Sequence, residues 1–216
     1  MKAQIIVPDH LKEITLKQYQ KFVKLQDKNE GTFFLQQKMV EIFCGIKAVD
    51  VLKIKYNDVD RITSVLNDMF DSKPELVKRF KLNNVEYGFI PNLSDLSFGE
   101  YVDLDTYMGD WENIHLAMNV LYRPIKQKQG KKYLIEEYKV EGKELIYDMP
   151  MDAVLSSVFF FFNLGKDCAT SILNYLDKEM VIQQVPDLDL AKNGDGINHF
   201  LHSLEGILQD LKISQN

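Results

Sequence analysis

Four carboxylates gather between positions 100 and 110, at Glu100, Asp103, Asp105 and Asp110. Two carboxyl groups can act as general acid and general base when their surroundings push their pKa values apart. On a helix, Glu100 and Asp103 share a face whereas Asp105 points elsewhere, and nothing nearby would separate their pKa values. Ser97 stands three residues before Glu100, which is the S-x-x-E pattern of a helix capping box. The pattern predicts a helix start whose aspartates face water or a partner, and no catalytic residue.

The histidines do not form a metal-binding pattern. His115 lies in a helical stretch, but neither residue four positions away is a histidine or a carboxylate, as an H-E-x-x-H site requires. Asp195, His199 and His202 would meet on one face of a helix, yet no nearby cysteine completes a zinc set. The polar stretch that begins at Asp187 departs from the calcium-loop pattern, and phosphate-binding glycine loops are absent from the sequence. We therefore expect no metal and no cofactor.

A cluster of lysines suggests a surface that binds another protein. Four of them surround the glycine of KQKQGKK, which we expect to be a hairpin turning at Gln129-Gly130: Lys126, Lys128, Lys131 and Lys132. Lysines on an edge strand discourage pairing with other chains, so one interpretation is a protected edge. The other interpretation is a docking arm for an acidic partner surface. Nucleic acid is the least favoured partner for this hairpin.

A run of four aromatic residues is the second candidate for partner binding. Its members are Phe159, Phe160, Phe161 and Phe162. Four consecutive residues point to all sides of a helix, so this helix needs cover on nearly every side. Either the core is thick at this point or a partner protein supplies the cover.

Composition excludes several classes of protein. The chain has 216 residues and a net charge of −6, so it lacks the overall positive field of a nucleic-acid-binding protein. The most apolar run, from Val154 to Leu164, is too short for a membrane span, and no signal peptide fits the N-terminus. Cys44 and Cys168 lie far apart among apolar residues, as buried reduced thiols do. We expect a protein of a reducing cytoplasm with no membrane contact.

Hydrophobic periodicity predicts a mainly α fold, a helical bundle with two small β-hairpins, and α+β is the alternative. Capping boxes at Thr15 and Ser97 start two helices, while Asn57 and Asp110 are the expected caps of two more. The expected helices cover residues 16–27, 32–43, 48–53, 57–70, 110–123, 151–180 and 197–211, another helix starts at Ser97, and Gly165 is a candidate bend. The first hairpin turns at Asn83-Asn84. We predict one domain, 1–216, or a subdivision into helical 1–75, mixed 76–148 and helical 149–216.

Residues 86–125 carry a family resemblance. Their shared features are F-I-P-x-L at 89–93, S-F-G-E-Y-V-D-L at 97–104, a W-x-x-x-H helix at 111–115, and L-Y-R-P at 121–124. With these features the chain resembles proteins of tailed bacteriophages found among tail and virion morphogenesis genes, including tail-assembly chaperones and related small structural proteins. The opening stretch VPDHLKEITLKQYQKFVKL is similar to the start of that group. The clear match covers about a quarter of the chain.

The resemblance implies a non-enzymatic protein that helps to build phage particles in the host cytoplasm, and that either leaves after assembly or stays in the virion. Its expected partners are other phage structural proteins of the tail or connector, and self-association is a further option. A host-directed or regulatory protein-binding module is the alternative from a different class. An enzyme that uses Glu100, Asp103 and His115 is the least favoured alternative.

Overall fold

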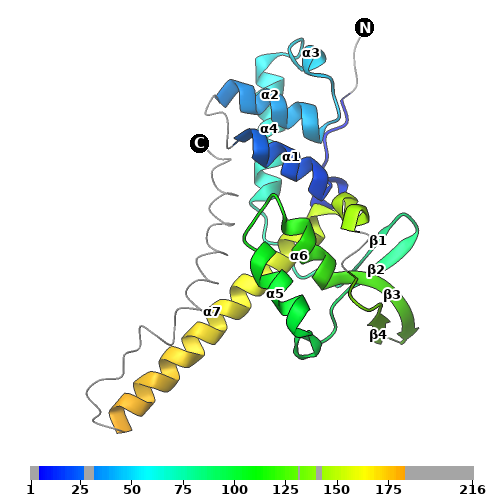
Figure 1. Cartoon of the computed structure of the whole chain (residues 1–216). Helices are drawn as coiled ribbons and strands as arrows, with labels where there is room; N and C mark the ends of the chain where they lie inside the picture. Colours follow the sequence, from blue (N-terminus) through cyan, green and yellow to red (C-terminus); the bar gives the residue numbers. More distant parts are fainter. Residues whose placement is uncertain (1–4, 27–31, 131, 140–142, 183–216) are drawn as a thin grey trace.

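The computed structural model describes residues 5–26, 32–130, 132–139 and 143–182 (Figure 1). Four helices come first, α1 (Leu16–Gln26), α2 (Thr32–Phe43), α3 (Ala48–Val51) and α4 (Tyr56–Phe70). The strands β1 (Arg79–Leu82) and β2 (Val85–Phe89) precede a pair of helices, α5 (Phe98–Tyr107) and α6 (Ile114–Leu121). The strands β3 (Tyr122–Gln129) and β4 (Lys132–Ile135) and the long helix α7 (Met151–Ile182) follow. Short 3-10 turns cover Leu11–Glu13, Leu93–Asp95 and Lys143–Asp148.

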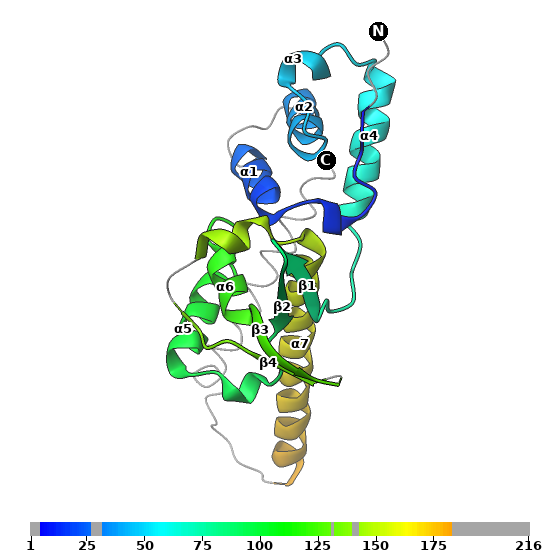
Figure 2. The same cartoon turned by 90° about the vertical axis from the view of Figure 1, so that its right-hand side faces the viewer.

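The strands form one antiparallel sheet in the order β1-β2-β3-β4, and this corrects the predicted fold class. The expected mainly helical bundle with two separate hairpins is wrong, because β2 and β3 join the hairpins through pairs such as Phe89↔Tyr122. The fold belongs to the α+β class. Pro124 was expected only to stop a helix, but the chain passes directly from Leu121 in α6 to Tyr122 in β3. In Figure 2 the sheet stands in front, with α5 and α6 on one side and α7 on the other.

Both predicted capping boxes are present. The Thr15 backbone N–H donates to Gln18 Oε1 at 2.9 Å, and the Gln18 N–H donates back to Thr15 Oγ1 at 3.2 Å. At α5, the Ser97 N–H donates to Glu100 Oε2 at 2.7 Å and the Glu100 N–H donates to Ser97 Oγ at 3.3 Å. These reciprocal bonds satisfy backbone donors that the first helical turn would otherwise leave unpaired.

The other two predicted caps differ from the structure. Helix α4 begins at Tyr56, one residue before Asn57, and the preceding Lys55 makes no side-chain cap. Asp110 accepts hydrogen bonds from the Glu112 N–H at 2.8 Å and from Asn113 Nδ2 at 2.6 Å. It therefore fixes the turn before α6 without being the residue next to the helix.

Positive backbone angles appear where the predicted turns need them. Asn83 and Asn84 have φ values of 49° and 64°, so the Asn-Asn hairpin is confirmed. Gly130 has φ 61° in the turn between β3 and β4, and Gly45 has φ 66° just after α2, as predicted for a helix stop.

Helix α7 runs unbroken through Gly165, so the candidate bend is not present. Its first turns are buried except at Asp152. Its start is tied to the N-terminal segment, because the Leu16 N–H donates to the Met149 carbonyl at 2.9 Å and the Met151 N–H donates to the Ile14 carbonyl at 2.8 Å. No helix among the described residues has the length and apolar character to cross a bilayer. The predicted loop at 181–196 lies outside the described residues from position 183 onward, and the predicted helix at 197–211 lies wholly outside them.

Tyr122 joins the sheet to α7. Its side chain is fully buried, and its hydroxyl donates to the carbonyls of Val77 at 2.8 Å and Ala153 at 3.1 Å. Its ring meets Phe89 edge-on at 5.3 Å. The Val77 N–H in turn donates to Ser156 Oγ on α7 at 3.1 Å. One side chain therefore holds the lead-in to β1, the start of β3 and the first turns of α7 together.

Replacing Tyr122 with phenylalanine tests this link. Tyr122→Phe keeps the ring but removes the hydroxyl that the carbonyls of Val77 and Ala153 share, so the free energy of unfolding should fall by about 1–3 kcal/mol in urea denaturation. Tyr101→Phe is the control, because Tyr101 is 58% exposed and its loss of a hydroxyl should have little effect. Equal stability of the wild type and Tyr122→Phe would contradict the link.

Candidate functional site

The two predicted partner-binding features meet at one groove. Lys132 at the start of β4 and Phe160 on α7 both line it. Lys126 lies at a register irregularity of β3, exposed and away from the groove lining. Lys128 forms an ion pair with Glu86 on β2. Lys131 lies outside the described residues.

The phenylalanine run is mostly covered by the core of the protein itself. Phe161 is only 5% exposed, and Phe159, Phe160 and Phe162 are half-buried. Phe160 meets Phe89 of β2 edge-on at 5.5 Å and Phe161 at 5.2 Å. A thick core therefore accounts for most of the run, and within this run only Phe160 contributes to the groove.

The groove lies between the β3–β4 hairpin, the segment after β2, and α7. Its volume is about 900 Å³, and its floor and walls are largely apolar: Leu76, Phe89, Ile90, Pro91, Leu93, Leu134 and Phe160. Its polar rim carries Lys78, Gln127, Gln129 and Lys132, and none of its lining residues in the described part of the chain is acidic. A largely apolar concavity with a few polar groups is the usual form of a binding site.

Tyr133 fixes the hairpin above β2. Its hydroxyl donates to the Phe89 carbonyl at 2.7 Å and to the Lys78 carbonyl at 3.2 Å. Its ring lies against Gly88, where an added Cβ would come within 2.4 Å of the ring. Glycine is required here for close approach, and the sequence interpretation missed both residues. A glycine between aromatic residues in a strand, as in EYGF, is the signal that could have indicated this contact.

A second hollow of about 510 Å³ adjoins the groove, with which it shares Ile90, Pro91, Asn92, Tyr133 and Leu134, and it contains a buried ion pair. Arg123 Nη1 of β3 lies 2.8 Å from Glu100 Oε1 of α5, and the two side chains are 11% and 9% exposed. Arg123 Nε is buried without a hydrogen-bond partner among the described residues. Glu100 therefore caps its own helix and also joins α5 to the sheet, a role that the sequence interpretation did not foresee.

The environment of Glu100 favours its ionised form. Burial by itself would raise the pKa of Glu100, but hydrogen bonds from Ser97 and the nearby Arg123 guanidinium outweigh it and hold the pKa below the usual value of 4.5. Asp103, predicted to face water or a partner, instead accepts a hydrogen bond from the Tyr138 hydroxyl at 2.6 Å.

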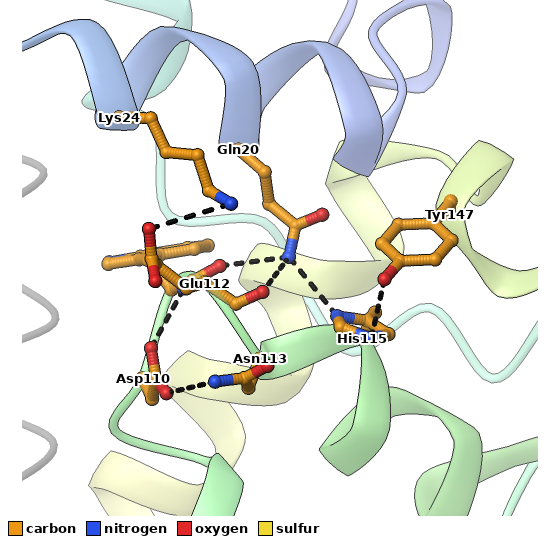
Figure 3. A network of polar contacts seen from close by, with 8 residues as sticks. Gln20, Lys24, Asp110, Glu112, Asn113, His115 and Tyr147 are labelled. Carbon is orange, nitrogen blue, oxygen red and sulfur yellow. Dashed lines mark hydrogen bonds and ion pairs between the residues drawn. The ribbon is translucent and has the colours of Figure 1, made fainter. Parts of the chain in front are cut away.

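His115 belongs to a separate network (Figure 3). Gln20 Nε2 donates to the carbonyls of Trp111 at 2.9 Å and Glu112 at 3.0 Å, and lies 3.3 Å from His115 Nδ1. The Tyr147 hydroxyl lies 2.8 Å from His115 Nε2. This buried network joins α1, α6 and the turn before α7. His115 and Glu100 therefore have different partners, and the structure does not bring them together as an acid–base pair.

Among the described residues, the other reactive side chains form no second site. Within the described residues, no three of the histidines, cysteines and carboxylates are grouped so that they could hold a metal ion. The Asp195, His199 and His202 group lies outside those residues. Cys44, predicted to be a buried reduced thiol, is half-buried, and this burial raises the pKa of its thiol to about 11. That shift keeps the thiol protonated and unreactive at neutral pH.

Glu100→Gln should make stability less dependent on pH. Because the folded-state pKa of Glu100 lies below 4.5, its stabilising effect is fully present above that value and is lost as the pH falls through the folded-state pKa. At neutral pH the variant should lose about 3–5 kcal/mol, since it leaves the Arg123 charge buried without its partner. That deficit should shrink as urea denaturation is repeated down to about pH 3.

Asp105→Asn is the matched control at an exposed position of α5, and it should change the free energy of unfolding by less than about 0.5 kcal/mol. A Glu100→Gln deficit that stays constant across the pH range would contradict the role given to the ion pair.

Comparison with known proteins adds no relative: no family model, no curated protein and no solved structure matches this chain.

Proposed function

We propose that this chain is a non-enzymatic assembly protein of a tailed phage, which binds other phage structural proteins during tail or virion morphogenesis. It acts either as a tail-assembly chaperone or as a small virion component of the connector or baseplate type. The observation that carries the proposal is that the residues of the phage-like motif F-I-P-x-L line the groove: Phe89, Ile90, Pro91 and Leu93. Residues that suggest the family are therefore also residues that line the groove.

Two other parts of the phage-like pattern stabilise the elements that surround the groove. The S-F-G-E-Y motif supplies Glu100 and the L-Y-R-P motif supplies Arg123, and these two residues form the buried ion pair beside β4. L-Y-R-P also contributes Tyr122, which ties β3 to α7. The residues of the phage-like pattern line the groove or stabilise the elements around it, and they do not form an acid–base pair. This arrangement fits a binding protein better than a catalyst.

The two versions of the proposal differ in what remains in the finished particle. Quantitative mass spectrometry of purified particles separates them, because a virion component is present at a fixed copy number whereas a chaperone is absent. A tape-measure or tail-tube gene beside the coding gene would support either version. A host-directed or regulatory binding module is the remaining candidate, and its gene would lie away from the structural genes.

Leu134→Asp in the phage gene should reduce the yield of complete particles. Leu134 lines the groove and is 62% exposed, so the variant should place a charge in the binding surface while changing stability by only about 0.5 kcal/mol. Plaque counts and electron microscopy measure the loss of particles. Binding to the partner should itself weaken at least about tenfold, which corresponds to about 1.4 kcal/mol.

Leu52→Asp provides the control. Leu52 is 72% exposed beside α3 and does not line the groove, so this variant should assemble particles like the wild type. Normal assembly by Leu134→Asp, with the variant folded, would argue against the groove as the working surface.

A further inference from the structure

We propose that the groove binds an extended segment of a partner protein in which carboxylates alternate with aliphatic side chains, and that this segment adds to the sheet as a strand beside β4. The inference rests on the proposed function and specifies the chemistry of the partner at the same groove. Backbone pairing, apolar contacts and charge each contribute to it.

Strand β4 is an edge of the sheet. It pairs with β3 along Gln127↔Leu134, Lys128↔Tyr133 and Gln129↔Lys132, and no described strand lies on its other side. An edge strand presents unpaired backbone donors and acceptors, which an extended peptide can satisfy by adding a strand. The edge borders the groove, since Lys132, Tyr133 and Leu134 all line it.

Apolar contacts would come from every second residue of the added strand. Successive side chains of a strand point to opposite faces, so the aliphatic set would face the apolar floor of the groove and the carboxylate set would point outward, within reach of the long lysine side chains at its rim. Leu134 is 62% exposed and Phe160 is half-buried, and together with Ile90 and Leu93 they would accept aliphatic side chains. Burying an exposed leucine side chain contributes favourably to binding.

Charge indicates which strands would be accepted. The chain has a net charge of −6, yet the groove lining carries Lys78 and Lys132 and no acidic residue among the described ones. Neither lysine forms an ion pair within the described part of the chain, whereas the neighbouring Lys128 is paired with Glu86. The same lysines repel basic edges and attract carboxylates, which unites the two sequence interpretations of the hairpin: protection and docking.

Fluorescence anisotropy with the full-length chain tests the inference. The probe is a labelled, end-capped peptide of about six residues, a typical strand length, in which aspartate alternates with leucine. It should bind at least about tenfold more tightly than the same peptide with lysine in place of each aspartate, and added salt should weaken its binding.

Two further peptides test the backbone pairing. One carries N-methyl groups at odd positions and the other at even positions, so each blocks the donors on one edge of an added strand. One of the two should bind like the parent peptide and the other should bind at least about tenfold more weakly. Leu134→Asp should abolish binding of the parent peptide, and Leu52→Asp should leave it unchanged.

Three results would overturn the inference. They are equal binding of the acidic and basic peptides, equal binding of the two N-methylated peptides, and absence of peptide binding together with self-association of the wild type that Leu134→Asp removes. The last result would make a second copy of this chain the occupant. Each leaves the proposed function intact if Leu134→Asp still impairs particle assembly, whereas normal assembly by that variant would count against the function itself.

Discussion

The buried hydroxyl of Tyr122 is the contact on which the arrangement of the sheet depends. It is hydrogen-bonded to the carbonyls of Val77, which leads into β1, and of Ala153 on α7. Side chains alternate along a strand, so Arg123, the next residue, points to the opposite face and pairs with Glu100 on α5. Two adjacent residues therefore attach β3 to α7 on one face and to α5 on the other.

The groove follows from how the sheet continues beyond that attachment. The pairing of β3 with β4 shifts register between Ile125 and Gln127, and such irregularities bend and twist a strand pair. Tyr133 then folds back over Gly88 and bonds to the Phe89 carbonyl. The Tyr133 contacts hold the hairpin over β2, and Leu134 of β4 lines the groove together with the apolar segment after β2 and Phe160. A concave, partly apolar surface next to an unpaired strand is the result.

Several local features of the fold could be predicted from the sequence, although the predicted caps at Asn57 and Asp110 were wrong, while non-local features could not be predicted. The capping boxes at Thr15 and Ser97 and the Asn83-Asn84 turn depend on residues within a few positions of one another, and the structure confirms them. Joining the hairpins requires pairs such as Tyr87↔Pro124, which have no local signature, and this is why the predicted mainly helical class is wrong. The α+β alternative describes the fold.

The same division holds for the candidate site. Lys132 and Phe160 were predicted as partner-binding residues, and the structure places both at the groove. The remaining phenylalanines of the run belong to the core or pack against it. The prediction missed this because it treated the two hairpins as separate and did not expect one sheet to cover helix α7. Ile90, Pro91 and Leu93 carried the family pattern but were not recognised as groove residues, since their position depends on β4, which follows about forty positions later in the sequence. The Glu100–Arg123 pair was missed for the same reason.

Site-specific photo-crosslinking during infection tests most directly whether this groove is the working surface. A photoreactive amino acid at position 134 should link the protein to a phage tail or connector component, through a peptide in which carboxylates alternate with aliphatic residues. The same amino acid at position 52 should give no such product. Crosslinks to a structural protein from position 52 and none from position 134 would contradict the account.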